Sequence, residues 1–217
     1  MVLFLLIGAI VVSWKLSDLT SDVAKKGGSS KKEEIVIVVD PGHGGEDPGK
    51  VGSNDVLEKD LNLQIAMKVK TMLEDAGITI VMTREDDKVP KAKKEDLDER
   101  VKLINDTNPK LALCIHQNSY PDESVKGAQV FYHTTTEQAE DVASIVQEEL
   151  RVVDPENKRQ IKENDTYYML KYTKVPTIIV ECGFLTNPEE AAKLTEEEYQ
   201  NQLAQAICEG IIKWLDK

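Results

Sequence analysis

Two histidines and one glutamate have the residue types and the positions that a catalytic metal site requires. His43 follows a run of β-branched residues, Glu58 stands at the start of a long helical pattern, and His116 ends a second apolar run. Sites in open α/β sheets gather beyond the carboxyl ends of the strands, so we expect the three side chains to meet in one crevice. Two histidines with a carboxylate form a known catalytic zinc set that leaves a fourth position for water.

A second glutamate, Glu181, has the position of a general base. It ends the apolar run "TIIVE", and a carboxylate that emerges from such a run is costly unless a charged group lies opposite. Water activated at a metal still needs a group that accepts its proton and passes it to the leaving nitrogen, normally a carboxylate that is not a ligand. The sequence therefore predicts this role for Glu181.

Each of these residues also has a simpler interpretation. His43 can be a turn residue in its glycine-rich loop, Glu58 a helix-start charge favoured by the helix dipole, His116 a core histidine, and Glu181 an ion-pair partner. Their coincidence at strand and helix ends favours the common site. Cys114 shares the face of His116 in an extended strand, which would bring a thiol near the metal, but we favour a buried packing role.

The elements that must position these residues follow from hydrophobic patterning. Short β-branched runs alternate with longer helical patterns from residue 34 onward, which is typical of an α/β domain with a largely parallel sheet. We expect one α/β domain over residues 34–217, with a mostly parallel mixed sheet of about six strands and helices on both faces. The expected strands include Glu34–Asp40, Ile78–Thr83, Leu111–His116, Ala128–His133 and Thr177–Cys182. The first expected helix begins at Leu57 and stops at Gly77. Further helices are expected near Leu97–Asn105, Glu137–Leu150, Thr166–Tyr172 and Glu196–Leu215, and a short one after Pro188.

Composition limits the class of protein. A chain of 217 residues fits one globular domain with an appended segment. A formal net charge of −12 argues against nucleic acid, because binding to a polyanion needs clustered lysine and arginine. The three cysteines all lie in apolar runs, so they predict buried thiols and no disulfide framework.

The first 33 residues predict an export signal or membrane anchor followed by a linker. The run "MVLFLLIGAIVVSW" has the length of a secretory apolar region, and a polar stretch rich in Gly, Ser and Lys follows it. No basic residue precedes the run and no small-x-small cleavage site stands out. An uncleaved anchor or a start codon further upstream would each explain this, and a terminal helix packed on the core is the alternative. We expect an exported, extracytoplasmic protein, held at the membrane through this segment.

An ordered set of motifs over about residues 35–217 resembles one known family. The motifs are "DPGHGGEDPG", "LEKDLNL", "TREDD" with "DERVKLIN", "CIHQNS" and "VPTIIVECGFLTNPEEAAKL". They are similar to the motifs of the zinc-dependent N-acetylmuramoyl-L-alanine amidases of bacterial cell-wall metabolism.

This resemblance implies one zinc ion per chain, held by His43, Glu58 and His116, with Glu181 as the essential acid/base. It also implies that Asn118 bonds substrate in the groove. The implied reaction hydrolyses the amide between the lactyl group of N-acetylmuramic acid and the L-alanine of the stem peptide. Zinc would polarise that carbonyl and stabilise the oxyanion.

The chain departs from the family pattern in two places. Family members commonly have serine where this chain has Cys114, and a thiol there could alter metal affinity or make the site sensitive to oxidation. Some members carry a long insertion that plugs the active site, but "QNSYPDESVKGAQVFYH" leaves no room for one after His116. We therefore expect activity to be controlled by other means.

The segment "NKRQIKENDTYYMLKYTKVPTIIVECGF" looks most like the branch of the family that acts on spore cortex in sporulation and germination, where it helps to form muramic lactam. The expected partner is peptidoglycan, and an accessory protein for delivery or activation is a further hypothesis. We expect a monomer, located in the cell wall or the forespore intermembrane space. Two other functions remain open: a zinc peptidase that cuts within the stem peptide, and a non-catalytic module that binds wall or partner.

Overall fold

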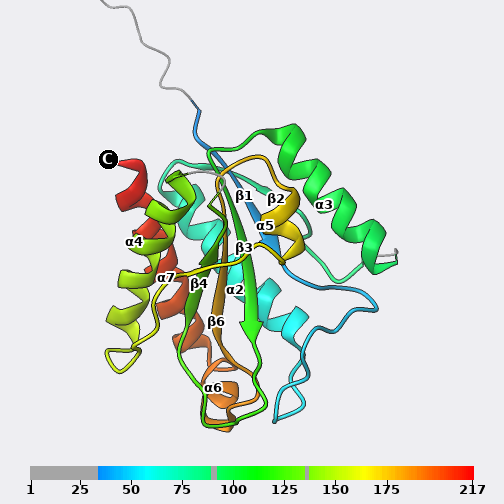
Figure 1. Ribbon diagram of the computed structural model, residues 1–217, viewed down its shortest axis with the longest axis vertical. Helices are drawn as coiled ribbons and strands as arrows, with labels where there is room; N and C mark the ends of the chain where they lie inside the picture. The colour runs from blue at the N-terminus through cyan, green and yellow to red at the C-terminus, as the bar shows by residue number, and fades with distance from the viewer. Residues whose placement is uncertain (1–33, 89–91, 135–136) are drawn as a thin grey trace, which may run out of the picture. The chain divides into compact units, whose positions relative to one another are not determined.

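A six-stranded mixed sheet forms the centre of the computed structural model, which describes residues 34–88, 92–134 and 137–217 (Figure 1). The strands are β1 (Val36–Pro41), β2 (Thr79–Met82), β3 (Leu111–Asn118), β4 (Gln129–Tyr132), β5 (Lys162–Glu163) and β6 (Thr177–Phe184), in the spatial order β2-β1-β3-β6-β4-β5. β2, β1, β3 and β6 run parallel, whereas β4 pairs antiparallel with β6. The predicted mostly parallel mixed sheet is confirmed.

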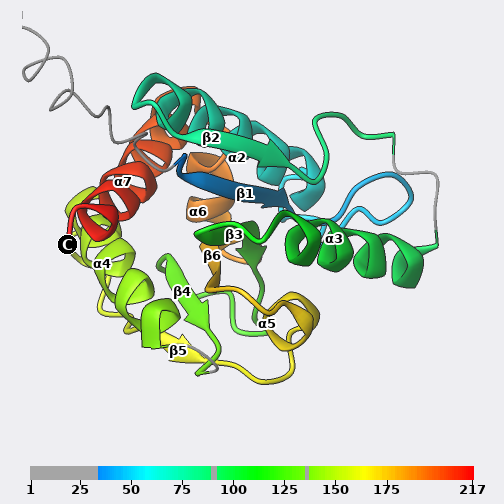
Figure 2. The ribbon, with the colours of Figure 1, turned by 90° about the horizontal axis from the view of Figure 1, so that it is seen from above.

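Helices cover both faces of the sheet, as predicted. They are α2 (Glu58–Asp75), α3 (Lys93–Thr107), α4 (Glu137–Val153), α5 (Tyr168–Tyr172), α6 (Pro188–Lys193) and α7 (Glu197–Leu215). α2, α4 and α7 pack on one face, while α3 and α5 lie on the other (Figure 2). Alternation along β3 serves both layers: Leu111, Leu113 and Ile115 face the first, and Ala112 and Cys114 face the second.

The register of the central strands brings their carboxyl ends to one edge of the sheet. Ile115 on β3 is paired with Pro41 on β1, and His116 is paired with Glu181 on β6. His43 lies only two residues beyond the end of β1. Three of the predicted site residues therefore share this edge because their strands are parallel neighbours.

Helix α2 contributes Glu58 to the site from its first turn. Its buried stripe of Leu61, Ile65, Val69 and Leu73 repeats every four residues, which keeps one face of the helix on the sheet. Glu58, at the first turn, is buried at the site end of the same helix. The expected stop at residue 77 is confirmed, because that glycine has a φ of 82° and closes the helix in the left-handed conformation.

Two elements differ from expectation. α3 begins at Lys93 and not near Leu97, because its first turn is exposed and carries charged residues that apolar periodicity does not reveal. β5 was not among the expected strands, since it has two exposed residues and no hydrophobic pattern. The predicted anchor and linker, residues 1–33, lie outside the described residues. Within the described ranges, no helix combines the length and apolarity needed to cross a membrane.

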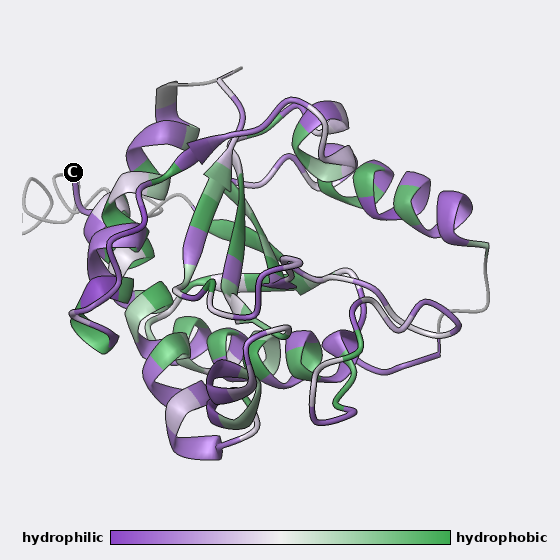
Figure 3. Ribbon diagram, turned by 60° about the horizontal axis from the view of Figure 1, so that its bottom comes forward, coloured by the Kyte–Doolittle hydropathy of each residue, from purple (hydrophilic) through white to green (hydrophobic). Residues whose placement is uncertain are grey.

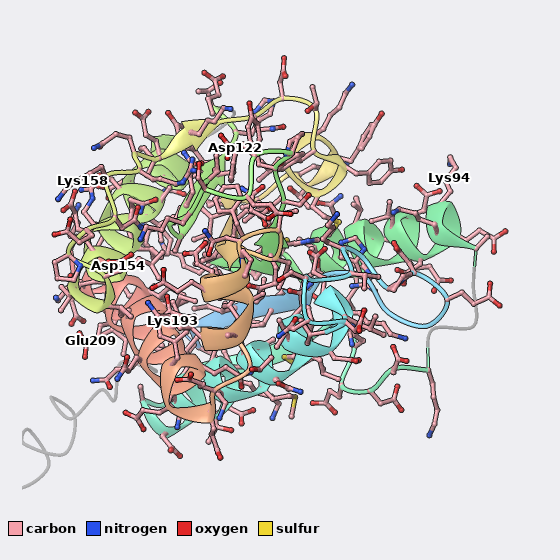
Figure 4. All side chains as sticks on the ribbon, turned by 90° about the horizontal axis from the view of Figure 1, so that it is seen from below. Lys94, Asp122, Asp154, Lys158, Lys193 and Glu209 are labelled. Atoms are coloured by element: carbon pink, nitrogen blue, oxygen red, sulfur yellow. The ribbon has the colours of Figure 1, made fainter. Side chains whose placement is uncertain are left out.

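Apolar residues gather between the layers and charged ones outside them. Figure 3 shows apolar strands enclosed by helices whose colouring alternates between apolar and polar. Figure 4 shows the charged side chains of Lys94, Lys193 and Glu209, all exposed, on helices around the sheet. The polar residues that are buried therefore stand out, and many of them lie around the carboxyl edge of the sheet.

The contact between α4 and α7 depends on a glycine. A Cβ atom at Gly210 would lie 2.8 Å from the Cα atom of Val146 on α4. Alanine favours a helix by about 1 kcal/mol over glycine, but overpacking costs about 1–3 kcal/mol. We therefore expect Gly210→Ala to lower the free energy of unfolding by about 1 kcal/mol in urea denaturation. Glu209→Ala, at an exposed neighbouring position, is the control, and equal stability of both variants would contradict the packing argument.

Candidate metal and catalytic site

The loop after β1 turns the His43 ring into the site. His43 has a φ of 62°, and Gly44 and Gly45 also have positive φ values. A residue with a Cβ atom loses about 1–2 kcal/mol in this left-handed conformation, so the surrounding contacts must hold it there. The result is that Nε2 of His43 lies 3.2 Å from Oε1 of Glu58.

Asp47 fixes the orientation of the same ring. Its Oδ2 atom lies 2.9 Å from Nδ1 of His43 and 2.9 Å from Nζ of Lys93. Partial burial opposes ionisation, but hydrogen bonds from Lys93 and His43 lower the pKa of Asp47 to about 2. An ionised carboxylate only accepts hydrogen bonds, so Nδ1 of His43 donates to Asp47, and Nε2 is the ring atom that would give up its proton to bind a metal.

Glu58 is a buried carboxylate surrounded by donors. Its Oε2 atom accepts a bond from the main-chain N–H group of Lys50 at 2.8 Å, and Oε1 accepts one from the main-chain N–H group of Gln117 at 3.1 Å. Burial works against ionisation, yet hydrogen bonds and charge interactions with His116 and His43 hold its pKa well below the ordinary value. Glu58 is therefore a carboxylate, the form that binds a metal.

The His116 ring completes the cluster and explains a glycine. Nδ1 of His116 lies 3.0 Å from Oε1 of Glu58, and the rings of His116 and His43 are 5.0 Å apart. A Cβ atom at Gly42 would lie 2.1 Å from Cε1 and Nε2 of His116. Only a residue without a side chain lets this ring lie against the loop.

The three side chains fit one metal ion. One ligand atom from each of His43, Glu58 and His116 lies within 4.8 Å of the others. Tetrahedral bonds of about 2.0–2.1 Å place ligand atoms about 3.3 Å apart, close to the 3.0 and 3.2 Å separations of Glu58 from the two rings. The structure thus brings together the three residues that the sequence singled out as ligands.

Glu181 has the opposite environment to Glu58. Its side chain is buried beside His116, and among the described residues its Oε2 is one of two buried side-chain oxygen or nitrogen atoms without a hydrogen-bond partner. Burial raises the pKa of Glu181 to about 7. A carboxyl group with this pKa can both accept and donate a proton near neutral pH.

A cleft of about 420 Å³ opens over these groups. The end of β3 lines it with Asn118 and Ser119, while α3 and α5 supply Leu97 and Met169. Asn118 thus lies in the groove, and its Oδ1 accepts a bond from the Ser119 amide. The cleft offers polar and apolar contacts next to the metal cluster.

Cys114 belongs to the core and not to the metal cluster. It shares the sheet face of His116 but lies two residues deeper, fully buried and paired in register with Asp40. Burial, together with the Asp40 charge, raises the pKa of its thiol well above the ordinary value. A neutral thiol of this kind packs as a small apolar residue.

Two further residues of the site, Asp47 and Tyr167, were not predicted from the sequence. Asp47 lies inside the glycine-rich stretch, but in a loop a spacing of four from His43 does not by itself predict contact. Tyr167, next to α5, also lines the cleft. Burial and the charges of Glu181 and Glu58 raise its pKa, so the hydroxyl group is a donor at neutral pH. The paired tyrosines in "TYYML" were the available signal.

Fold and site define an α/β protein with a two-histidine, one-glutamate cluster at the carboxyl edge of its sheet. The chain belongs to the N-acetylmuramoyl-L-alanine amidase family, whose model matches residues 37–213. It is 38% identical over 188 residues to the germination-specific N-acetylmuramoyl-L-alanine amidase of Bacillus subtilis, covering 82% of this chain and 79% of the relative. The predicted family is confirmed.

Solved structures agree with this assignment. The CwlD amidase from Clostridioides difficile, in complex with the GerS lipoprotein, is 36% identical with a TM-score of 0.81, covering 84% of this chain and 99% of that one. An N-acetylmuramoyl-L-alanine amidase from Clostridium difficile 630 is 33% identical with a TM-score of 0.78, covering 85% and 98%. The likeness extends over nearly the whole of each solved chain and over most of this one.

The contact between Asp47 and His43 yields a prediction for metal binding. Removing a carboxylate that orients a ligating histidine lowers metal affinity about 10- to 100-fold. We expect Asp47→Ala to weaken zinc binding by that factor in a chelator-competition titration. Glu46→Ala, at the exposed neighbouring position, is the matched control. Equal zinc affinity in both variants would show that Asp47 does not orient the ring.

Proposed function

We propose that this protein hydrolyses the amide between N-acetylmuramic acid and the L-alanine of the stem peptide, with one zinc ion bound by His43, Glu58 and His116. The observation that carries the proposal is Glu181, a buried carboxyl group with an unpartnered oxygen beside a three-ligand cluster. Family membership supports the same reaction. A bound zinc ion supplies a Lewis acid for the carbonyl and lowers the pKa of water.

Glu181 moves the proton in this scheme. As a carboxylate it takes a proton from the attacking water, and the protonated group then donates to the amine nitrogen as the amide bond breaks. Its pKa of about 7 suits both steps, because neither form is strongly disfavoured at neutral pH. The atoms balance: water adds across the amide, and a carboxylic acid and a free amine leave.

The cleft binds the two sides of the scissile amide with different contacts. Asn118 and Ser119 offer polar groups for the substrate, whereas Leu97, Tyr167 and Met169 offer apolar and aromatic surface. Peptidoglycan presents both kinds of group near this bond, in the amides of the chain and in the methyl groups of the lactyl and alanyl units. We assign Asn118 to hydrogen bonding with substrate.

We further propose a role in spore-cortex modification, in which the amidase reaction precedes muramic lactam formation. Support comes from the identity with the germination-specific relative.

The reaction takes place outside the cytoplasm at the cell wall, with residues 1–33 as signal or anchor and residues 34–217 as the catalytic domain. Because the CwlD amidase was solved with the GerS lipoprotein, an accessory protein is a reasonable partner here as well. The monomeric state stays a prediction.

Product analysis separates the amidase from its two rivals. Purified protein is incubated with cortex muropeptides and zinc, and the products are identified by mass spectrometry. The amidase releases an intact stem peptide that begins with alanine. Shortened peptides still attached to muramic acid would indicate the peptidase. Absence of any product would mean either that an accessory protein must complete the site or that the chain is the non-catalytic module.

The proton-transfer role of Glu181 is tested by Glu181→Gln. General acid–base groups contribute about 100- to 10,000-fold to a rate, so we expect kcat to fall by that factor while zinc affinity stays at the wild-type value, because Glu181 is not a ligand. Glu163→Gln, an exposed change on β5, is the control and keeps full activity. Wild-type kcat in Glu181→Gln would assign the proton transfer to another group.

Asn118→Ala tests substrate binding. Loss of one hydrogen bond of about 1 kcal/mol raises KM about fivefold, and we expect zinc affinity to remain at the wild-type value. Steady-state kinetics on a soluble muropeptide provide the measurement, with Asn201→Ala on α7 as the control. An unchanged KM would remove Asn118 from the substrate contacts.

A further inference from the structure

Two buried arginines converge on the loop that carries His43, and the proposed chemistry uses neither. Arg84 lies in the motif "TREDD" just beyond β2, and Arg100 lies in the motif "DERVKLIN" on α3. Arg84 is 8% exposed and Arg100 is 4% exposed. Burying a guanidinium group is costly unless its donors are satisfied, so the partners of these side chains show what the burial achieves.

Arg100 bridges two carbonyl groups of the loop. Its Nη1 atom donates to the Pro41 carbonyl at 2.8 Å, and Nη2 donates to the His43 carbonyl at 2.7 Å. Nη1 also lies 2.9 Å from Oδ1 of Asp40, and Nε lies 2.8 Å from Oδ2 of Asp96. One rigid side chain on α3 thereby holds the main chain on both sides of Gly42.

Arg84 approaches the same turn from β2. Its Nε atom donates to the Pro41 carbonyl at 2.9 Å, and Nη2 donates to the Gly42 carbonyl at 3.1 Å. Nη2 also donates to the Lys59 carbonyl at 2.8 Å, in the first turn of α2. Arg84 therefore joins the His43 loop to the helix that begins with Glu58.

Carbonyl groups of three successive residues, 41 to 43, thus accept hydrogen bonds from these two arginines. A main chain fixed at three successive carbonyl groups cannot relax from the left-handed φ of His43. The planar guanidinium fork holds two acceptors in one geometry, which a lysine ammonium cannot reproduce. The contacts act on the main chain that aims Nε2 of His43 toward Glu58.

We propose that Arg84 and Arg100 are positioning residues for His43 and set the metal affinity of the site. This inference rests on the proposed metal site and deepens it. The alternative is a purely structural role, in which the Arg100–Asp40 ion pair stabilises the core without influence on the metal. The bonds to the loop carbonyls favour positioning, since an ion pair with Asp40 alone would not require them.

The test compares Arg84→Lys and Arg100→Lys with Arg151→Lys in the full chain. Arg151 is a matched control because it also donates to a main-chain carbonyl, that of Arg159, but it lies on α4. Three quantities are measured for each protein: zinc affinity by chelator competition, the visible absorption spectrum with Co2+ in place of zinc, and the unfolding temperature without metal. A purely structural role would change only the unfolding temperature without metal.

We expect Arg84→Lys and Arg100→Lys to bind zinc about 10- to 100-fold more weakly than wild type, the range seen when a group that orients a metal ligand is lost. Their Co2+ spectra should also be altered, while Arg151→Lys keeps wild-type values. Wild-type zinc affinity and a wild-type Co2+ spectrum in a folded arginine-to-lysine variant would overturn the inference. If Arg100→Lys does not fold, the result for Arg84→Lys decides alone. Absence of zinc binding by the wild-type protein would instead overturn the proposed metal site, and this inference with it.

Discussion

The burial of one ionised carboxylate, Glu58, is the constraint on which the site depends. Its oxygens accept bonds from the main-chain amides of Lys50 and Gln117 and face the rings of His43 and His116. These partners come from the loop after β1 and from β3, while Glu58 itself begins α2. The N-terminal position also places the charge at the favourable end of the helix dipole. Satisfying this single charge therefore fixes three segments of the chain relative to one another.

The two site glutamates show how environment assigns different chemistry to the same side chain. Glu58 is surrounded by donors and stays ionised, whereas Glu181 is buried with an unpartnered oxygen and has a pKa of about 7. A carboxylate ligand must stay ionised, whereas a general base must be able to take up and release a proton. Parallel pairing of β3 with β6 sets Glu181 beside His116, so the sheet itself brings the two functions together.

The sequence predicted most of the sheet and its helices from local patterns, and it predicted that His43, Glu58 and His116 lie together from their places at strand and helix ends. Short apolar runs rich in β-branched residues mark the strands, and His43 and His116 belong to a rare residue type and follow or end such runs. Asp47 and the arginine contacts could not be predicted in the same way. Arg84 meets Gly42 across 42 positions of sequence, and only the pairing of β1 with β2 brings them together. The start of α3 could not be predicted because its first turn is largely exposed and charged, so it carries no apolar periodicity.

Anomalous diffraction at the zinc absorption edge, from crystals grown with zinc, shows directly which residues bind the metal. We expect one strong peak about 2.0–2.2 Å from Nε2 of His43, a carboxylate oxygen of Glu58 and Nδ1 of His116. Glu181 should lie near the peak without binding it. A peak elsewhere, or a zinc ion that takes Glu181 as a ligand in place of Glu58, would rule out this metal site.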